Sequence, residues 1–379
     1  MAEIKKHRTK ILHIGCRAFP CGTAEAFSFQ EVIHLSGQNL GNFFIGEAVC
    51  RHLRHYYADE VDISYYSIDD LKACSLHELD NKFDHIVMAA SNLLRPNAYF
   101  NIYEKLLSAT TLPITVMGLG AQAAEMSDEI VLTPTTERFV KMVSERSYKI
   151  GVRGAYTASI LEKLSIHNIE ITGCPTLYVN RAEDCDFNIP KDKPLRLALS
   201  TTHDNHDYRQ YDQALDLYRK MFKYLLNAHS YHILQTHTID AQLAAHATLS
   251  QNDLMATKKL YGLDSLEDAD QLVSLSKVFY TYQQWSDFLK CHIDLAFGTR
   301  LHGNLMAITN GIPALFIAHD TRLLEICDYF SLPHLTLEEL KDKPLTDALI
   351  RQNTDFTAFK TKLASQRPLF EDFLQNSLK

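Results

Sequence analysis

Short apolar runs alternate with longer amphipathic stretches along most of the chain. In the first half these runs lie at 10–16, 61–66, 85–90, 113–117, 149–152 and 170–172. In the second half they lie at 195–200, 231–236, 277–282, 293–297 and 313–318. The stretches between them place apolar residues at helical spacing. The pattern therefore predicts alternating strands and helices, which is typical of doubly wound α/β domains with parallel sheets.

Three segments depart from this alternation. Residues 181–194 are polar with two prolines, which favours a linker between domains. Residues 345–378 are helical in pattern, whereas 17–35 match no pattern and are predicted to be a long loop. A chain of 379 residues is too long for one ordinary core. We expect two Rossmann-like domains facing across a cleft, at 1–185 and 190–345, and a helical tail at 346–379 that packs back on the first domain.

Composition narrows the class of protein. Hydrophobic residues make up 46% and charged residues 22%, as in a globular protein. The net charge of -8 argues against a general nucleic-acid binder. Apolar runs are too short for a membrane span or a signal peptide, so a cytoplasmic protein is expected. The eight cysteines show no paired spacing and the histidines no metal-ligand spacing, so we expect reduced thiols and no metal.

The turn after the predicted strand 293–297 carries candidate chemistry. It reads Gly298-Thr299-Arg300-Leu301-His302 and opens a helix that Asn310-Gly311 closes. Ligands of parallel sheets bind beyond the carboxyl ends of the strands. A guanidinium beside a helix N-terminus suits a phosphate or carboxylate, and an imidazole moves protons near neutral pH. Alternatively, Arg300 pairs with a buried carboxylate and His302 is structural.

Polar or glycine residues follow four predicted strands of the first domain and are expected along one rim of its sheet. They are Ser91-Asn92, Gly118 to Gln122, Arg153-Gly154 and Gly173 to Thr176. Arg153 must find a partner or a ligand at the end of a buried strand, and a salt bridge is the alternative. Further candidates for the cleft are Asn39 and Asn42, from a glycine-rich turn that opens a helix, and also Gln122 and His237.

Four short motifs occur in a fixed order along the chain. They are Gly118-Leu119-Gly120-Ala121-Gln122, Val152-Arg153-Gly154, Thr172-Gly173-Cys174-Pro175, and Gly298-Thr299-Arg300-Leu301-His302 with Ala307 and Gly311-Ile312-Pro313. In order and spacing they resemble the polysaccharide pyruvyl transferase family across roughly residues 36 to 330. That family is similar in fold to GT-B glycosyltransferases, in agreement with the two lobes.

The resemblance implies transfer of the enolpyruvyl group of phosphoenolpyruvate to a sugar hydroxyl of a surface-polysaccharide or exopolysaccharide precursor, usually as a pyruvate ketal with release of phosphate. Phosphoenolpyruvate is then a co-substrate, and no cofactor is expected. The donor-binding residues of the family correspond to Arg153, Arg300, Leu301 and His302. Arg300 and His302 are the expected catalytic residues, with His302 the candidate acid that protonates the enol carbon.

Two positions depart from the family pattern. Many members have an acid where this chain has Asn42, and many have Asp where it has Cys174. The first departure leaves open how the acceptor hydroxyl is activated. The expected acceptor is a saccharide, lipid-linked or not, so peripheral contact with a membrane stays open, as does the oligomeric state.

Two other classes of protein remain. A GT-B glycosyltransferase with a nucleotide-sugar donor needs a carboxylate for the ribose, and Asp320 is the candidate near the second-domain rim. A binding protein that kept the fold without the chemistry is the other alternative, because fold alone does not fix function.

Overall fold

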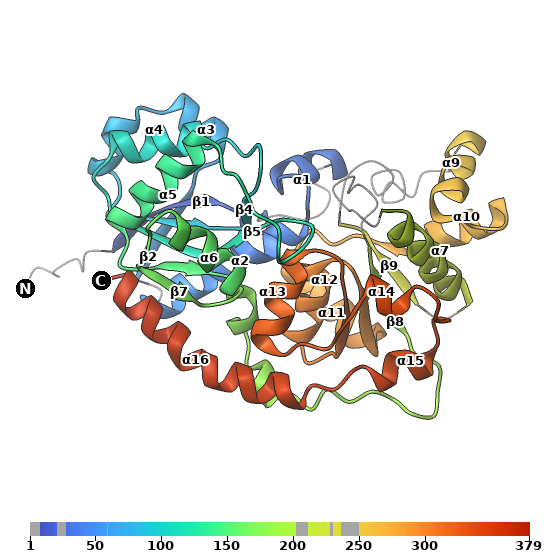
Figure 1. Ribbon diagram of the computed structural model, residues 1–379. Helices are drawn as coiled ribbons and strands as arrows, with labels where there is room; N and C mark the ends of the chain where they lie inside the picture. The colour runs from blue at the N-terminus through green and yellow to red at the C-terminus, as the bar shows by residue number, and fades with distance from the viewer. Residues whose placement is uncertain (1–7, 21–27, 59, 202–210, 228–229, 236–249) are drawn as a thin grey trace, which may run out of the picture.

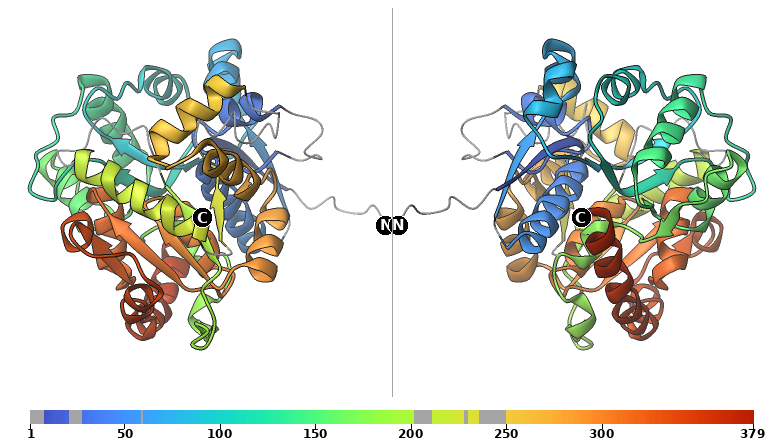
Figure 2. Two further views of the ribbon diagram at one scale, coloured as in Figure 1. Left: turned by 90° about the vertical axis from the view of Figure 1, so that its right-hand side faces the viewer. Right: turned by 90° about the vertical axis from the view of Figure 1, so that its left-hand side faces the viewer.

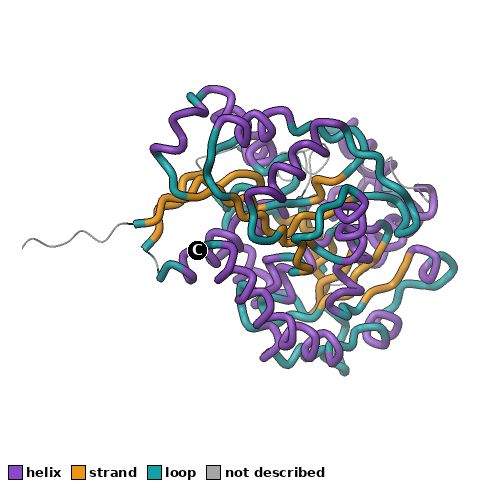
Figure 3. Tube along the Cα trace, turned by 60° about the vertical axis from the view of Figure 1, so that its left-hand side comes forward, coloured by secondary structure: helices purple, strands orange, loops and turns teal. Residues whose placement is uncertain are grey.

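The computed structural model describes residues 8–20, 28–58, 60–201, 211–227, 230–235 and 250–379. Two parallel β-sheets, each flanked by helices, form the two halves of the molecule (Figures 1 and 3). The expected pair of doubly wound Rossmann-like domains is confirmed. The exact domain limits of 1–185, 190–345 and 346–379 stay a prediction.

The first sheet has the strand order β2-β1-β3-β5-β6-β7, and β4 pairs with β5. Its strands are β1 Thr9–Gly15, β2 Val61–Tyr65, β3 His85–Ala89, β4 Asn92–Leu94, β5 Ile114–Ala121, β6 Ile150–Val152 and β7 Ile169–Ile171. Its helices are α1 Phe29–Leu35, α2 Gly41–Tyr56, α3 Ile68–Ala73, η2 Leu76–Asn81, α4 Asn101–Ala109, α5 Pro134–Arg146 and α6 Ala155–Lys163, followed by the short turns η3 Pro175–Tyr178 and η4 Ala182–Asp184.

The second sheet has the strand order β10-β9-β8-β11-β12-β13. Its strands are β8 Leu197–Ser200, β9 Tyr231–Ile233, β10 Ser276–Lys277, β11 Leu295–Gly298, β12 Ala314–Ala318 and β13 His334–Thr336. Its helices are α7 Tyr211–Asn227, α9 Gln251–Tyr261, α10 Leu266–Leu275, α11 Tyr282–His292, α12 Leu301–Ile308, α13 Thr321–Phe330, α14 Leu337–Leu340 and α15 Asp347–Gln352. The chain ends with α16 Thr357–Ser377. Among the described helices, none is long and apolar enough to cross a membrane.

Two sequence predictions are wrong in part. The segment 17–35 contains helix α1, which begins with a capping box in which Ser28 and Glu31 exchange hydrogen bonds. The predicted strand 277–282 reduces to the two residues of β10, because Thr281 caps α11 by accepting a hydrogen bond from Gln284 N at 3.1 Å. Residues 236–249, in the helical stretch expected between the runs 231–236 and 277–282, lie outside the described part of the chain.

The strand order reverses once in each sheet, next to β1 in the first and next to β8 in the second. Strand β1 lies between β2 and β3, and strand β8 lies between β9 and β11. At such a point the neighbouring connections run to opposite faces, which opens a crevice at the carboxyl ends of the strands. The turn after β11 that carries Arg300 and His302 lies at this point of the second sheet.

One apolar core is shared by the two domains. It contains Ile11 and Val87 from the first sheet together with Ala296 and Phe316 from the second. Two further cores lie on the other faces of the two sheets. The inner faces of the two sheets therefore pack into one continuous core, and the two rims lie next to each other.

Helix α16 crosses from the second domain to the first along one side of the molecule (Figures 1 and 2). Its Phe373 lies against Gly151 of β6, and Thr115 of β5 donates a hydrogen bond to Ser377 O at 2.7 Å. Arg367 pairs with Glu183 in the segment that joins the domains. The last helix is therefore part of the packing of the first domain.

A carboxylate of the second domain caps a helix of the first. Glu325 of α13 accepts hydrogen bonds from Thr157 N at 2.6 Å and Thr157 Oγ1 at 2.9 Å, at the start of α6. Nearby, Thr321 Oγ1 accepts a hydrogen bond from Ala123 N at 2.9 Å, just after β5. These bonds join α13 to the rim of the first sheet.

Replacing Glu325 by alanine is expected to lower the free energy of unfolding by about 2–4 kcal/mol, because Thr157 loses two buried partners. Burial raises the pKa of Glu325. Over the pH range between the ordinary glutamate pKa and this raised value, the folded protein therefore binds more protons than the unfolded chain, and stability falls as pH rises. Glu325→Gln should lack that decline. Denaturant unfolding at several pH values measures both effects, and equal pH dependence in the two proteins would contradict the assignment.

Candidate active site

Arg300 and His302 are positioned by the tight turn between β11 and α12. Arg300 is the N-cap of α12 without a side-chain cap of its own, so the first N–H groups of the helix face the crevice. The backbone N–H groups of Thr299 and Arg300 donate to Ser200 O, at 2.9 and 3.2 Å. Arg300 Nε donates to Thr201 O at 3.2 Å. The half-buried guanidinium is therefore held at the rim of the second sheet.

His302 lies where the two domains meet. Its side chain is only 7% exposed and packs under the start of α2, where a Cβ added to Gly41 would lie 2.8 Å from His302 Cβ. Its Nε2 lies 3.7 Å from Cys174 Sγ, which belongs to the first domain. Nδ1 makes no hydrogen bond to the residues that the structure describes. The imidazole is thus hydrogen-bonded to the described part of the first domain through Nε2 only.

Positive charge surrounds this imidazole. Burial lowers the pKa of His302 well below the ordinary 6.5. Three arginines lower the pKa further through their charge: Arg153, Arg322 and Arg300. A neutral His302 is therefore expected near pH 7 in the free protein, and an anion bound among the arginines would favour its protonation.

Arg153 is fully buried at the end of β6 and extends along the rim of the first sheet. Its donors meet neutral oxygens only: Nε donates to Gly118 O at 2.9 Å, Nη1 to Asn92 Oδ1 at 2.6 Å and Nη2 to Ala90 O at 3.4 Å. The ends of β3, β5 and β6 thus converge on this guanidinium. Among the described residues no carboxylate forms an ion pair with Arg153; Glu325, bound to Thr157, acts on it only through its charge.

Asp320 and Arg322 lie at the start of α13, on the second-domain side. Asp320 Oδ1 accepts from Arg322 N at 3.0 Å and Leu323 N at 3.3 Å, and Asp320 Oδ2 pairs with Arg322 Nε. Asp320 Oδ2 also lies 3.6 Å from Nε2 of the buried His319. Both carboxylate oxygens of Asp320 are therefore engaged within the protein.

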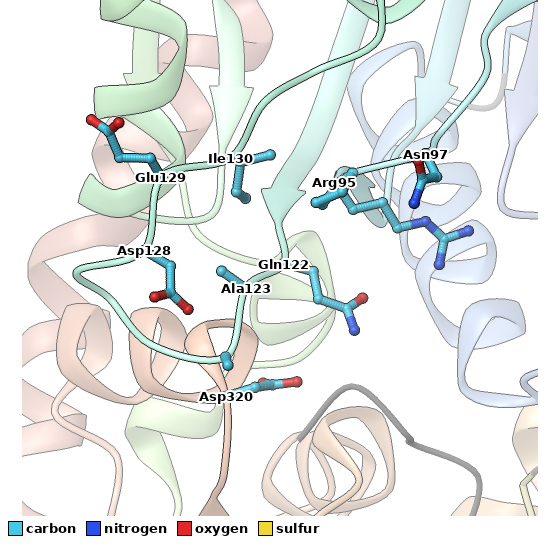
Figure 4. A pocket seen from close by; sticks show the side chains of 10 residues that line it. Arg95, Asn97, Gln122, Ala123, Asp128, Glu129, Ile130 and Asp320 are labelled. Carbon is cyan, nitrogen blue, oxygen red and sulfur yellow. The ribbon is translucent and has the colours of Figure 1, made fainter. Parts of the chain in front are cut away.

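A cavity of about 650 Å³ opens between the two rims. Its lining includes Arg95 and Gln122 of the first domain and Asp320 of the second, whose side chains reach into the same space (Figure 4). The Arg95 side chain is exposed, and Gln122 follows the end of β5. This cavity is a candidate place for the acceptor.

The remaining predicted cleft residues have different surroundings. Asn39 Oδ1 accepts a hydrogen bond from Gly41 N at 3.0 Å, and Asn42 Nδ2 donates to Ser36 O at 2.9 Å. These asparagines therefore shape the start of α2, which packs on His302. Leu301 is buried in the shared core, so its side chain is used in packing. His237 lies outside the described residues.

Sequence reasoning missed two contributors to this site, Arg322 and the contact between Cys174 and His302. Asp320-Thr321-Arg322 follows the apolar strand β12, so the end-of-strand argument used for Arg153 and Arg300 could have included Arg322. No local pattern could have paired Cys174 with a residue of the other domain.

Comparison with known proteins gives one family and a set of distant structural likenesses. The family model for polysaccharide pyruvyl transferase matches residues 39–321. No match was found among curated proteins.

Three solved structures illustrate the structural likenesses. A putative UDP-N-acetylglucosamine 2-epimerase from Listeria monocytogenes has a TM-score of 0.48 at 10% identity, over 98% of this chain and 97% of that one. S. aureus MnaA, solved with UDP, has a TM-score of 0.44 at 11% identity, over 97% and 98%. The lipopolysaccharide outer core galactosyltransferase WaaB has a TM-score of 0.43 at 8% identity, over 98% and 99%. At these scores the likenesses say nothing about what this chain binds.

Proposed function

Because this chain belongs to the polysaccharide pyruvyl transferase family, we propose that it transfers the enolpyruvyl group of phosphoenolpyruvate to a sugar hydroxyl and releases phosphate. The acceptor is a saccharide of a surface-polysaccharide precursor, and the reaction takes place in the cytoplasm without a cofactor.

The observation that carries this proposal is the fully buried Arg153, which has no carboxylate partner in the described part of the chain. A buried guanidinium is costly when no ion pair balances its charge. Arg300 and Arg322 lie close enough to act on the same imidazole. An anion with two charged groups suits such a cluster, because guanidinium groups bind carboxylate and phosphate by forked hydrogen bonds. Phosphoenolpyruvate has one of each.

The proposed reaction assigns His302 the proton transfer. Binding of the anionic donor offsets the arginine charges and lets His302 hold a proton, which it gives to the methylene carbon of phosphoenolpyruvate. A sugar hydroxyl attacks the adjacent carbon, and its proton returns to the imidazole. A second hydroxyl then displaces phosphate, and its proton leaves with the phosphate, which gives the ketal. Arg153 and Arg300 hold the carboxylate and phosphate throughout.

The nucleotide-sugar alternative loses its main support, because both carboxylate oxygens of Asp320 are already engaged at the start of α13. A ribose would have to displace these contacts. The acceptor is instead assigned to the cavity lined by Arg95 and Gln122, where amide and guanidinium groups can bind sugar hydroxyls.

Thermal melting of the purified protein tests the donor. Phosphoenolpyruvate at about 100 times its dissociation constant should stabilise the protein by about 2.7 kcal/mol, and UDP, GDP and CMP should not. Arg300→Ala should lose the shift, whereas Arg138→Ala, on the exposed face of α5, should keep it. Phosphate release with a saccharide acceptor measures turnover. Stabilisation by a nucleotide alone would overturn the proposal in favour of a glycosyltransferase.

A further inference from the structure

The thiol of Cys174 links His302 to a buried hydroxyl of the first domain. Cys174 is fully buried just before η3, and its Sγ lies 3.7 Å from His302 Nε2 and 3.1 Å from Thr176 Oγ1. Thr176 is also fully buried. Its Oγ1 has no hydrogen-bond partner besides this sulfur among the described residues.

The direction of these two hydrogen bonds follows from what each group can donate. A buried hydroxyl that leaves its proton without an acceptor is costly, so Thr176 O–H points at Cys174 Sγ. The thiol then has its own proton to give, and a neutral imidazole offers Nε2 as the acceptor. In the opposite direction, Nε2–H donates to sulfur, the thiol donates to Thr176, and the Thr176 proton has no acceptor. The first direction gives both the hydroxyl and the thiol an acceptor, and leaves only the ring N–H on Nδ1 without a partner among the described residues.

This direction fixes where the imidazole proton sits. When Nε2 accepts a hydrogen bond, the proton of neutral His302 is on Nδ1, since the bond made by one ring nitrogen sets the state of the other. Nδ1 is the nitrogen that makes no hydrogen bond to described residues, so Nδ1–H is left for a ligand.

We propose that Cys174 is a positioning residue, whose thiol holds His302 as the Nδ1–H tautomer in the free protein and lets it become protonated only when an anionic donor binds. A carboxylate at position 174 would accept a hydrogen bond from Nε2–H and would favour the imidazolium ion both with and without a bound donor. A thiol can donate to Nε2 and can also accept from Nε2–H once the ring is charged. The part that concerns the donor rests on the proposed function; the tautomer does not.

The other charged groups near His302 support this reading. Arg300 on its own turn, Arg153 at the end of β6 and Arg322 on α13 are all cationic and all lower the pKa of His302. At the start of α2 its neighbour is Gly41, which carries no charge. Within the described part of the chain, three cations and a thiol act on the imidazole and no carboxylate does, so a bound anion would supply the counter-charge.

Nitrogen NMR of histidine-labelled protein tests the tautomer directly, because Nδ1–H and Nε2–H imidazoles differ in their nitrogen shifts. The chain has 18 histidines, so His302→Gln identifies the signal of interest. We expect neutral Nδ1–H in the free protein and in Cys174→Ser, which keeps a donor and an acceptor. Cys174→Ala should give a mixture of tautomers. Cys174→Asp should raise the titration midpoint of His302 by about one to three pH units.

A second thiol–histidine contact provides the matched control. Cys50 Sγ lies 3.5 Å from Nδ1 of the buried His13, in the first domain. Cys50→Ala should leave the His302 signal unchanged. An Nε2–H tautomer in the native protein, or a native tautomer in Cys174→Ala, would overturn the role of Cys174.

Kinetic measurements of pyruvyl transfer distinguish a failure of the positioning role of Cys174 from a failure of the proposed function. Cys174→Ala should lower kcat for pyruvyl transfer by about 10- to 100-fold with little change in the KM for phosphoenolpyruvate, and Cys174→Ser should restore it. A native kcat in Cys174→Ala overturns the positioning role. Absence of any pyruvyl transfer by the native protein, with the expected tautomer, refutes the proposed function and leaves the tautomer assignment supported.

Discussion

Arg153→Met is expected to abolish the stabilisation by phosphoenolpyruvate and to lower kcat/KM for pyruvyl transfer by about 10²- to 10³-fold, the usual cost of losing one charged donor in a closed site. Methionine keeps the apolar length of the side chain but offers no donor. Gly118 O, Asn92 Oδ1 and Ala90 O lose their partner as well, so we also expect a lower melting temperature. Melting curves with and without phosphoenolpyruvate, together with initial rates, measure the two effects separately.

Arg146 offers a matched control. It also donates to backbone carbonyls, Leu107 O at 2.6 Å and Leu112 O at 3.1 Å, but it lies at the end of α5 away from the cavity. Arg146→Met should lower the melting temperature and keep the response to phosphoenolpyruvate. If Arg153→Met responds to phosphoenolpyruvate as Arg146→Met does, Arg153 does not bind the donor.

Gly298→Ala is expected to destabilise the protein by more than about 3 kcal/mol and to disrupt the donor site. Gly298 has φ +144, and a Cβ there would lie 2.0 Å from Ser200 O. The obstacle is backbone of the neighbouring strand β8, so β11 and β8 must separate at the point where Arg300 N and Thr299 N bond to Ser200 O. Denaturant unfolding gives the loss of stability, and phosphoenolpyruvate titration gives the loss of binding.

Gly37→Ala separates backbone strain from this close approach. Gly37 has φ +65, but the nearest atom to an added Cβ is Asn42 Nδ2 at 3.7 Å. It should cost only about 1–2 kcal/mol, the ordinary cost of a left-handed conformation. Equal losses in the two variants would mean that the contact with Ser200 does not matter.

The alternation of apolar runs predicted the two sheets because parallel strands are buried on both faces and are visible as continuous runs. The same logic placed Arg153 and Arg300 at strand ends. Short helices and strands were not predicted by this alternation. Helix α1 has a readable signal, the capping box of Ser28 and Glu31, but its seven residues are too few to show a clear period. Strand β10 has only two residues, so its pairing with β9 is set by the sheet.

The contacts that turn separate motifs into a site could not be predicted from the sequence. Cys174 and His302, which form a hydrogen bond between the two domains, are 128 positions apart, and Glu325 and Thr157 are 168 positions apart. Such contacts depend on how the two domains pack, and local patterns carry no information about it. The sequence therefore identified candidate residues but not the partners that set their protonation.

At both rims a glycine with positive φ lies close to the backbone of the neighbouring strand. Gly15 at the end of β1 has φ +86, and an added Cβ would lie 2.4 Å from Ala89 O of β3, as Gly298 approaches Ser200 of β8. The next residue then donates its N–H across the gap, Cys16 to Ala89 O at 2.8 Å and Thr299 to Ser200 O at 2.9 Å. In each sheet a glycine lets the chain turn closely over its neighbour where the strand order reverses.

The course of α16 has a consequence for how the protein acquires its structure during synthesis. Thr115 and Gly151 of the first sheet are covered by Ser377 and Phe373 near the end of the chain. During synthesis these surfaces therefore stay exposed until the second domain and α16 have been translated. We infer that the first domain cannot reach its final packing as soon as it emerges, and that the order of maturation differs from the order of translation.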